Sequence, residues 1–142
     1  MTSHVFQVGV YHMTTGGFRN GLDRAGWEKD VAVASQKVMD GIKDKRYVMC
    51  AQVQAVSLED ALTLTQNLTE EGWAAGEAVV FAAQHRDGEN RQRSSMVGDL
   101  FLFNGDAYVV AAIGFQKLHG CVAREISDMG FDGRTGTAFD DR

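Results

Sequence analysis

The sequence predicts an α+β fold in which a single mixed or mainly antiparallel sheet of about five strands carries two main helices on one face. Apolar residues alternate along residues 4–13 and 46–56, as they do in β-strands. They recur every three or four positions along residues 22–45 and 58–71, which is the spacing of one helix face. An Asn-Gly pair at residues 104–105 separates two further apolar runs and predicts a hairpin.

The composition is typical of one globular domain covering residues 1–142. Of the 142 residues, 44% are hydrophobic and 23% are charged, and one domain usually holds about 100–200 residues. The chain has 16 glycines and no proline, so glycine has to supply most of the turns. Residues 131–142 are rich in glycine and aspartate, and we expect them to form an irregular C-terminal tail.

The first strand is followed by a glycine-rich loop. One face of the strand predicted over residues 4–13 carries Phe6, Val8, Val10 and His12. Residues 14–21 contain three glycines and short polar side chains, which is typical of a loop.

The first main helix is predicted over residues 22–45. Its buried stripe has spacings of four, three, four and four residues and consists of Trp27, Val31, Ala34, Val38 and Ile42. Gly26 and Gly41 weaken the two ends, since glycine costs roughly 1 kcal/mol relative to alanine inside a helix.

The second strand and the second main helix meet at Ser57. The strand covers residues 46–56, and the helix covers residues 58–71. Ser57 and Asp60 have the spacing of a capping box, in which two side chains satisfy free amides at a helix start. Gly72 is a natural helix end.

The second half of the chain is dominated by strands. Residues 77–83 are a short apolar run that predicts a strand, and residues 84–96 are polar and long enough for a mobile loop. The Asn-Gly turn joins a strand at 100–103 to one at 106–113, because both turn residues tolerate positive φ. Residues 121–129 predict a short helix.

Charge and hydropathy exclude several classes of protein. Nineteen acidic residues against fourteen basic ones give a net charge of −5, whereas general nucleic-acid binding needs a basic surface. The chain lacks the run of about 18 apolar residues that a membrane span needs. Residues 1–7 lack the basic and apolar parts of a signal peptide. The sequence therefore predicts a soluble intracellular domain.

Residues that bind metals or catalyse reactions do not occur in a recognisable pattern. The histidines and cysteines show neither a C-x-x-C nor an H-x-x-x-H spacing: His4, His12, Cys50, His85, His119 and Cys121. A nucleophile and base could be drawn from Cys50, His85, Ser94 and Asp99, but the G-x-S-x-G elbow is missing. We expect no catalytic residue, no metal and no cofactor, and we expect both cysteines to be reduced.

The glycine-rich loop at residues 14–21 lies between a strand and a helix, where backbone amides can hold an anion. It matches neither G-x-x-x-x-G-K-[ST] nor G-x-G-x-x-G. We therefore favour a purely geometric role for these glycines over an anion site.

The polar segment 86–99 is the best candidate for a binding site. Three of the fourteen basic residues fall within eight positions of it, next to two serines. Guanidinium groups beside hydroxyls suit phosphate or carboxylate recognition. The predicted ligand-binding residues are Arg86, Arg91, Arg93, Ser94, Ser95 and Asp99. We expect Arg91 and Arg93 to contact the anion and Asp99 to accept bonds from nearby amides; the alternative is a solvated loop balanced by acidic neighbours.

Two stretches resemble a family of small uncharacterised proteins from phages and bacterial mobile elements. The first runs from Ser57 through Asn67 to Trp73, and the second from Arg93 through the hairpin to Phe115. In the family the second stretch begins with arginine, serine, any residue, serine, valine, glycine and aspartate. Here Met96 stands in place of the second serine, so this chain lacks that hydroxyl. The resemblance covers residues 57–118 and implies a phage or plasmid origin and a bacterial cytoplasmic setting, without a reaction.

These observations favour a phage or mobile-element protein that binds a host or defence component without catalysis. One alternative is a binder of a small anionic ligand, such as a nucleotide or nucleotide signal, on the arginine segment. Another is an enzyme with an unmarked site. We expect no general nucleic-acid binding and no membrane association. Residues 100–103 carry two phenylalanines and neither proline nor lysine, so an exposed edge there would favour a homodimer or a covering tail.

Overall fold

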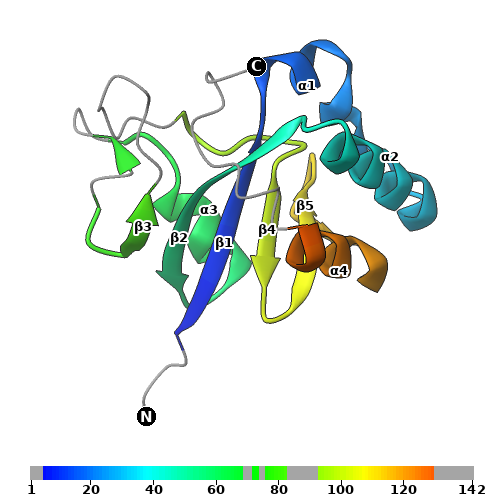
Figure 1. Ribbon diagram of the computed structural model, residues 1–142. Helices are drawn as coiled ribbons and strands as arrows, with labels where there is room; N and C mark the ends of the chain where they lie inside the picture. The colour runs from blue at the N-terminus through cyan, green and yellow to red at the C-terminus, as the bar shows by residue number, and fades with distance from the viewer. Residues whose placement is uncertain (1–4, 69–71, 74–75, 83–92, 130–142) are drawn as a thin grey trace.

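The computed structural model describes residues 5–68, 72–73, 76–82 and 93–129. Within these residues it confirms the α+β fold: six strands form one antiparallel sheet, and helices pack against it (Figure 1). No helix in the described ranges is long and apolar enough to cross a bilayer. In chain order the elements are β1 (Phe6–Met13), α1 (Thr15–Arg19), the 3-10 helix η1 (Leu22–Gly26), α2 (Val31–Lys43), β2 (Tyr47–Ala55), α3 (Leu58–Leu64), β3 (Val79–Ala82), β4 (Leu100–Phe103), β5 (Asp106–Val110), β6 (Phe115–Lys117) and α4 (Gly120–Met129).

Strand β1 lies inside the sheet, whose strand order is β3-β2-β1-β4-β5-β6. It pairs antiparallel with β2 on one side and with β4 on the other. Strand β4 also pairs with β5, so residues 100–103 are not an exposed edge. The argument for a homodimer from that edge therefore fails, and the edges of the described sheet are β3 and β6.

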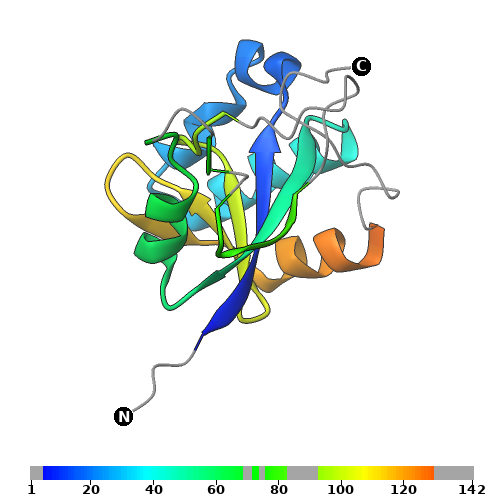
Figure 2. The same ribbon diagram turned by 90° about the vertical axis from the view of Figure 1, so that its left-hand side faces the viewer.

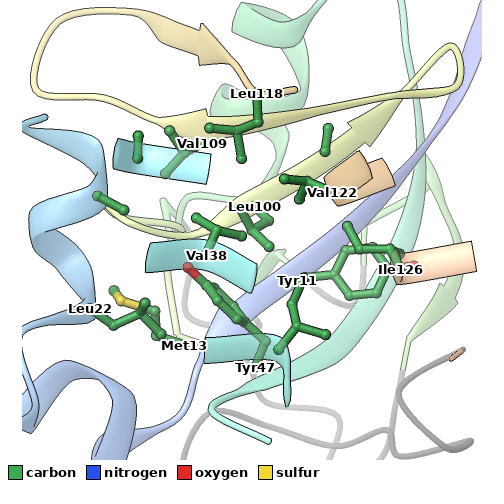
Figure 3. Packing of buried hydrophobic residues seen from close by; sticks show 14 of the residues in the cluster. Tyr11, Met13, Leu22, Val38, Tyr47, Leu100, Val109, Leu118, Val122 and Ile126 are labelled. Atoms are coloured by element: carbon green, nitrogen blue, oxygen red, sulfur yellow. The ribbon is translucent and has the colours of Figure 1, made fainter. Parts of the chain in front are cut away.

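Helices cover both faces of the sheet, whereas the sequence led us to expect both main helices on one face. Helices α2 and α4 pack on the face that carries Tyr11 and Met13 (Figure 3). Helix α3 lies on the opposite face of the sheet (Figure 2). There its apolar side chains belong to the same buried cluster as Val8 and Val10. The reason is that β1 has apolar side chains on both of its faces, and each face needs a cover.

The helix predicted over residues 22–45 is broken into η1 and α2. Gly26 ends η1 where the chain lies directly against β5, since a Cβ atom there would be 2.3 Å from the carbonyl oxygen of Val110. Asp30 then caps α2 by accepting hydrogen bonds from two amides of its first turn. Trp27, which the periodicity placed on the buried stripe, lies in the linker and is 64% exposed.

Helix α3 begins as predicted and ends early. The Ser57 hydroxyl accepts a hydrogen bond from the Asp60 amide at 3.0 Å, and the Asp60 carboxylate accepts one from the Val56 amide at 3.0 Å. The helix ends at Leu64 rather than at residue 71, since the amides of Thr65 and Gln66 bond three residues back, to Leu62 and Thr63, and no longer four residues back as in an α-helix.

The hairpin turn is confirmed, and two short elements are additional to the predicted ones. Asn104 and Gly105 have φ values of 51° and 83°, as a type I′ turn requires. Helix α1 lies within the glycine-rich loop, and β6 follows a second turn in which Gly114 has φ 72°. Both elements are too short to show a hydrophobic period, so periodicity alone does not detect them.

Candidate functional site

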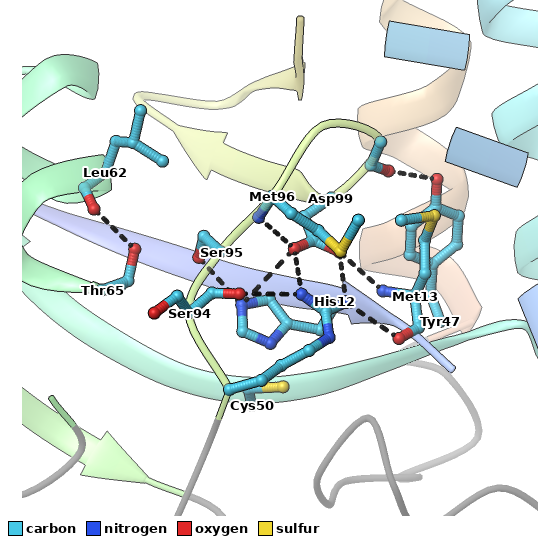
Figure 4. Close-up of polar contacts among 12 residues, drawn as sticks. His12, Met13, Tyr47, Cys50, Leu62, Thr65, Ser94, Ser95, Met96 and Asp99 are labelled. Atoms are coloured by element: carbon cyan, nitrogen blue, oxygen red, sulfur yellow. Dashed lines mark hydrogen bonds and ion pairs between the residues drawn. The ribbon is translucent and has the colours of Figure 1, made fainter. Parts of the chain in front are cut away.

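Asp99 is the centre of a buried polar cluster on the α3 side of β1 (Figure 4). Its carboxylate accepts hydrogen bonds from the amides of Met13 (2.9 Å) and Met96 (2.8 Å). Arg93 donates two hydrogen bonds of 2.7 Å, one to each carboxylate oxygen, in the bidentate geometry that pairs guanidinium with carboxylate most strongly. Asp99 itself is fully buried, and these four donors compensate its charge.

His12 is the second buried member of the cluster. Its Nε2 lies 2.8 Å from the Ser95 hydroxyl and 3.7 Å from the Asp99 carboxylate. Burial lowers the pKa of His12 to about 4, against a smaller opposing effect of Asp99, so the ring is neutral at pH 7. Its Nδ1 is buried and has no hydrogen-bond partner among the described residues. The ring of Trp73 lies edge-on at 6.0 Å.

The cluster contains serine, histidine and aspartate but does not have the geometry of a catalytic triad. In a triad, serine and aspartate contact opposite nitrogens of the ring, whereas here Ser95 and Asp99 both lie nearest Nε2. Ser95 is only 5% exposed. Cys50, which lies nearby, is fully buried, and burial raises the pKa of its thiol, so it is not a thiolate at neutral pH.

Hydrogen bonds with other parts of the fold hold the 93–99 segment in place, and four of them are donated by Tyr47, Gln66, Asn67 and Trp73. Three of these bonds go to backbone carbonyls of the segment and are donated by an indole, a side-chain amide and a buried tyrosine hydroxyl. In the fourth, a serine hydroxyl of the segment accepts from a backbone amide. They are Trp73 Nε1 to Arg93 O (2.7 Å), Gln66 Nε2 to Ser95 O (3.0 Å), Asn67 N to Ser94 Oγ (2.8 Å) and Tyr47 Oη to Gly98 O (2.8 Å). The segment is therefore anchored to the rest of the fold, with Ser95, Gly98 and Asp99 buried and its other residues partly exposed.

The structure brings four of the six predicted site residues together: Arg93, Ser94, Ser95 and Asp99. Their polar groups bond to the protein itself, and the Arg93 side chain is only 17% exposed. The other two, Arg86 and Arg91, lie outside the described residues. Within the described part of the segment, the geometry is that of a structural ion pair.

Two residues of the glycine-rich loop at residues 14–21 have a role in packing and turn geometry. Thr14 is buried, and its hydroxyl accepts a hydrogen bond from the Gly17 amide at 3.1 Å. A Cβ atom on Gly17 would be 2.9 Å from the carbonyl oxygen of Arg46, so glycine allows close packing there.

A different surface has the character of a binding site. We call it the Trp27 surface; it comprises two adjoining hollows that share Trp27, Glu28 and Lys29. The first hollow, of about 470 Å³, is mainly apolar, and it is lined in addition by Gly26, Ala111, Ala112, Ile113, Phe115 and Gln116. Trp27 is 64% exposed and Ile113 is 94% exposed.

The second hollow of the Trp27 surface is basic. It also has a volume of about 470 Å³, and Arg24 and Lys37 line it together with the shared residues. The hollow also contains the carboxylate of Glu28, which accepts a hydrogen bond from the Asp30 amide at 3.2 Å. Among the described residues, none of the three cations Arg24, Lys29 and Lys37 forms an ion pair, because none has a carboxylate oxygen within 4.0 Å.

The walls of the Trp27 surface are bonded to each other. The Ala112 amide donates to the Gly26 carbonyl at 3.0 Å, and the Gln116 side chain donates to the Lys29 carbonyl at 3.2 Å. These bonds fix the β5–β6 turn against the linker between η1 and α2. The surface is thus preformed and needs little ordering before it binds.

The sequence did not predict the Trp27 surface, because periodicity assigned Trp27 to the core. The signal that could have located it is Gly26, which interrupts the apolar stripe just before Trp27. No family model, curated protein or solved structure matches the chain.

Proposed function

We propose that this protein binds another protein on the Trp27 surface, without catalysis. The observation that carries the proposal is the exposure of Trp27 (64%) and Ile113 (94%) around one apolar hollow. Burying a large apolar side chain contributes about 1.5–3 kcal/mol, so a partner that covers these two residues gains affinity from both. Contiguous exposed apolar groups rimmed by polar ones are typical of protein-binding sites.

The residue types on the Trp27 surface also support this proposal. Tryptophan and arginine are the residues most often found at the energetic centre of protein interfaces, and Trp27 and Arg24 line the same hollow. The hydrogen bonds between the two walls reduce the entropy that binding would otherwise cost.

The Asp99 cluster supports a non-catalytic role. A nucleophile has to reach its substrate, whereas Ser95 is 5% exposed and Cys50 is fully buried. A general base needs a free ring nitrogen that faces the reacting proton, and His12 is fully buried. These groups stabilise the fold around β1.

The partner we propose is a host or defence protein of a bacterium. The resemblance of residues 57–118 to phage and mobile-element proteins supports this setting. A net charge of −5 makes a nucleic acid an unfavourable partner for the whole surface.

A quantitative pull-down from bacterial lysate tests the proposal. The bait is the full chain, the Trp27→Ala variant, or a Leu68→Ala control, since Leu68 is 77% exposed and does not line the Trp27 surface. We expect one or more proteins to be retained by the unmodified chain and the control, and to fall at least tenfold with Trp27→Ala.

Thermal denaturation of each bait shows that it is folded. Retention of the same proteins at the same level by folded Trp27→Ala would overturn the assignment of the Trp27 surface.

A further inference from the structure

We infer that the partner presents an acidic side chain and a bulky apolar one close together in a single segment. The acidic side chain occupies one hollow of the Trp27 surface, and the apolar side chain occupies the other. This inference rests on the proposed function and names the chemistry of the partner. It follows from the adjacency of an apolar hollow and a basic hollow that share Trp27 as a common wall.

The apolar hollow selects a bulky apolar side chain. Trp27, Ala111, Ala112 and Ile113 supply hydrocarbon or ring surface. On this side of the hollow, the Ala112 amide and the Gln116 side chain already bond to the carbonyls of Gly26 and Lys29. The charged residues that line the hollow, Glu28 and Lys29, are the two that it shares with the basic hollow. A polar group placed against the apolar part of this wall would lose water without a matching partner, which costs about 1–3 kcal/mol for a typical group.

The basic hollow selects a carboxylate. Arg24, Lys29 and Lys37 bring three cations to a hollow that contains one carboxylate, Glu28. Because none of the three is in an ion pair within the described chain, each is available to a partner. The rest of the chain is acidic overall, so this local positive charge also steers an acidic segment toward the Trp27 surface.

The shared wall sets the spacing in the partner. Trp27, Glu28 and Lys29 line both hollows, so the two binding groups of the partner have to be near neighbours. A segment with aspartate or glutamate within a few residues of leucine, phenylalanine or tryptophan meets this condition.

Selection from a library of displayed random peptides on the purified full chain tests the inference. We expect enriched peptides to place acidic and large apolar residues side by side, and to lose at least tenfold in affinity with Trp27→Ala. The double variant Arg24→Glu, Lys37→Glu should lower the affinity of these peptides roughly tenfold, which corresponds to about 1.4 kcal/mol. Added salt should weaken binding to the unmodified chain.

Lys43→Glu is the matched control for charge reversal. Lys43 is exposed on the same helix, α2, but lines neither hollow, so its reversal should leave peptide affinity within about twofold. Retained affinity in the double variant would overturn the inferred carboxylate.

The remaining outcomes separate this inference from the proposed function. Peptides that depend on Trp27 but show no acidic preference would overturn the partner chemistry and leave the proposed function in place. Saturable quenching of Trp27 fluorescence by ATP, lost in Trp27→Ala, would assign the surface to a nucleotide instead. A dimer mass in light scattering that reverts to 15.5 kDa with Trp27→Ala would assign it to a second copy of the chain.

Discussion

Arg93 illustrates how one buried carboxylate can direct an arginine away from solvent. Asp99 lies six residues further along the chain and holds the guanidinium by two hydrogen bonds of 2.7 Å. The Met13 carbonyl accepts a third hydrogen bond from Arg93 at 3.0 Å. The side chain therefore joins the 93–99 segment to the end of β1.

We predict that Arg93→Ala destabilises the protein by about 2–4 kcal/mol, because it leaves the buried Asp99 charge without its cation. Arg93→Lys should lose less, since it keeps the charge but not the bidentate geometry. Urea denaturation of the three proteins measures the difference. A loss below about 0.5 kcal/mol for Arg93→Ala would show that the guanidinium is free to bind a ligand.

His12 makes the stability of the protein depend on pH. Burial lowers the pKa of His12 from 6.5 to about 4, so between these values the unfolded chain binds the proton and the folded chain does not. The contribution of His12 to stability is therefore present above pH 6.5 and is lost as pH falls through 4. We expect the free energy of unfolding to fall between pH 7.5 and pH 4.5, and about 2–3 kcal/mol of this fall to come from His12.

Two measurements check the pH prediction. In NMR spectra, the ring signals of His12 should stay constant between pH 7 and pH 5.5. In urea denaturation, His119→Gln, which removes an exposed imidazole, should keep the pH dependence of the unmodified chain. A His12 ring that titrates near 6.5 would contradict the prediction.

At the scale of elements, the sequence predicted the features that depend on neighbouring residues. It did not predict those that depend on contacts between residues far apart in the chain. The Ser57 cap and the Asn104-Gly105 turn are local, and both are confirmed. The break before Trp27 depends on Gly26 meeting β5, which no nearby residue specifies. Similarly, Arg93 and Asp99 are close in the sequence, but the sequence does not show that both side chains bond to the backbone of Met13 at the end of β1.

Gly26 gives a test of this contact between elements. In Gly26→Ala, the new Cβ would lie 2.3 Å from the Val110 carbonyl oxygen and 2.6 Å from Val97, so η1 has to move away from β5. We expect a loss of about 1–3 kcal/mol, and weaker binding of any Trp27-dependent partner, because the wall of the apolar hollow moves.

Gly120→Ala is the control for this substitution. A Cβ atom on Gly120, at the start of α4, would have no neighbour within 4 Å. This variant should keep its stability or gain about 0.4–1 kcal/mol, since alanine restricts the unfolded chain. Thermal and urea denaturation distinguish the two variants, and equal effects would refute the contact.

At the scale of the whole molecule, the sheet combines pairings of very different sequence separation. β1 pairs with β2, which follows after α1, η1 and α2, and with β4, which lies more than 80 residues along the chain. Closing the longer loop costs chain entropy before its contacts form, and sheets with such pairings fold in milliseconds to seconds.

The absence of proline adds a second constraint on refolding. Non-proline peptide bonds favour the trans form by about 2.5–4 kcal/mol, so the unfolded chain does not accumulate the slow isomers that proline produces. We predict that refolding lacks the phase of about 10–100 s that proline isomerisation causes at 25 °C. Stopped-flow double-jump experiments measure this: the refolding amplitudes should not change with the time that the chain spends unfolded. A slow phase that grows with this delay would contradict the prediction, whereas a slow phase independent of it would be assigned to the pairing of β1 with β4.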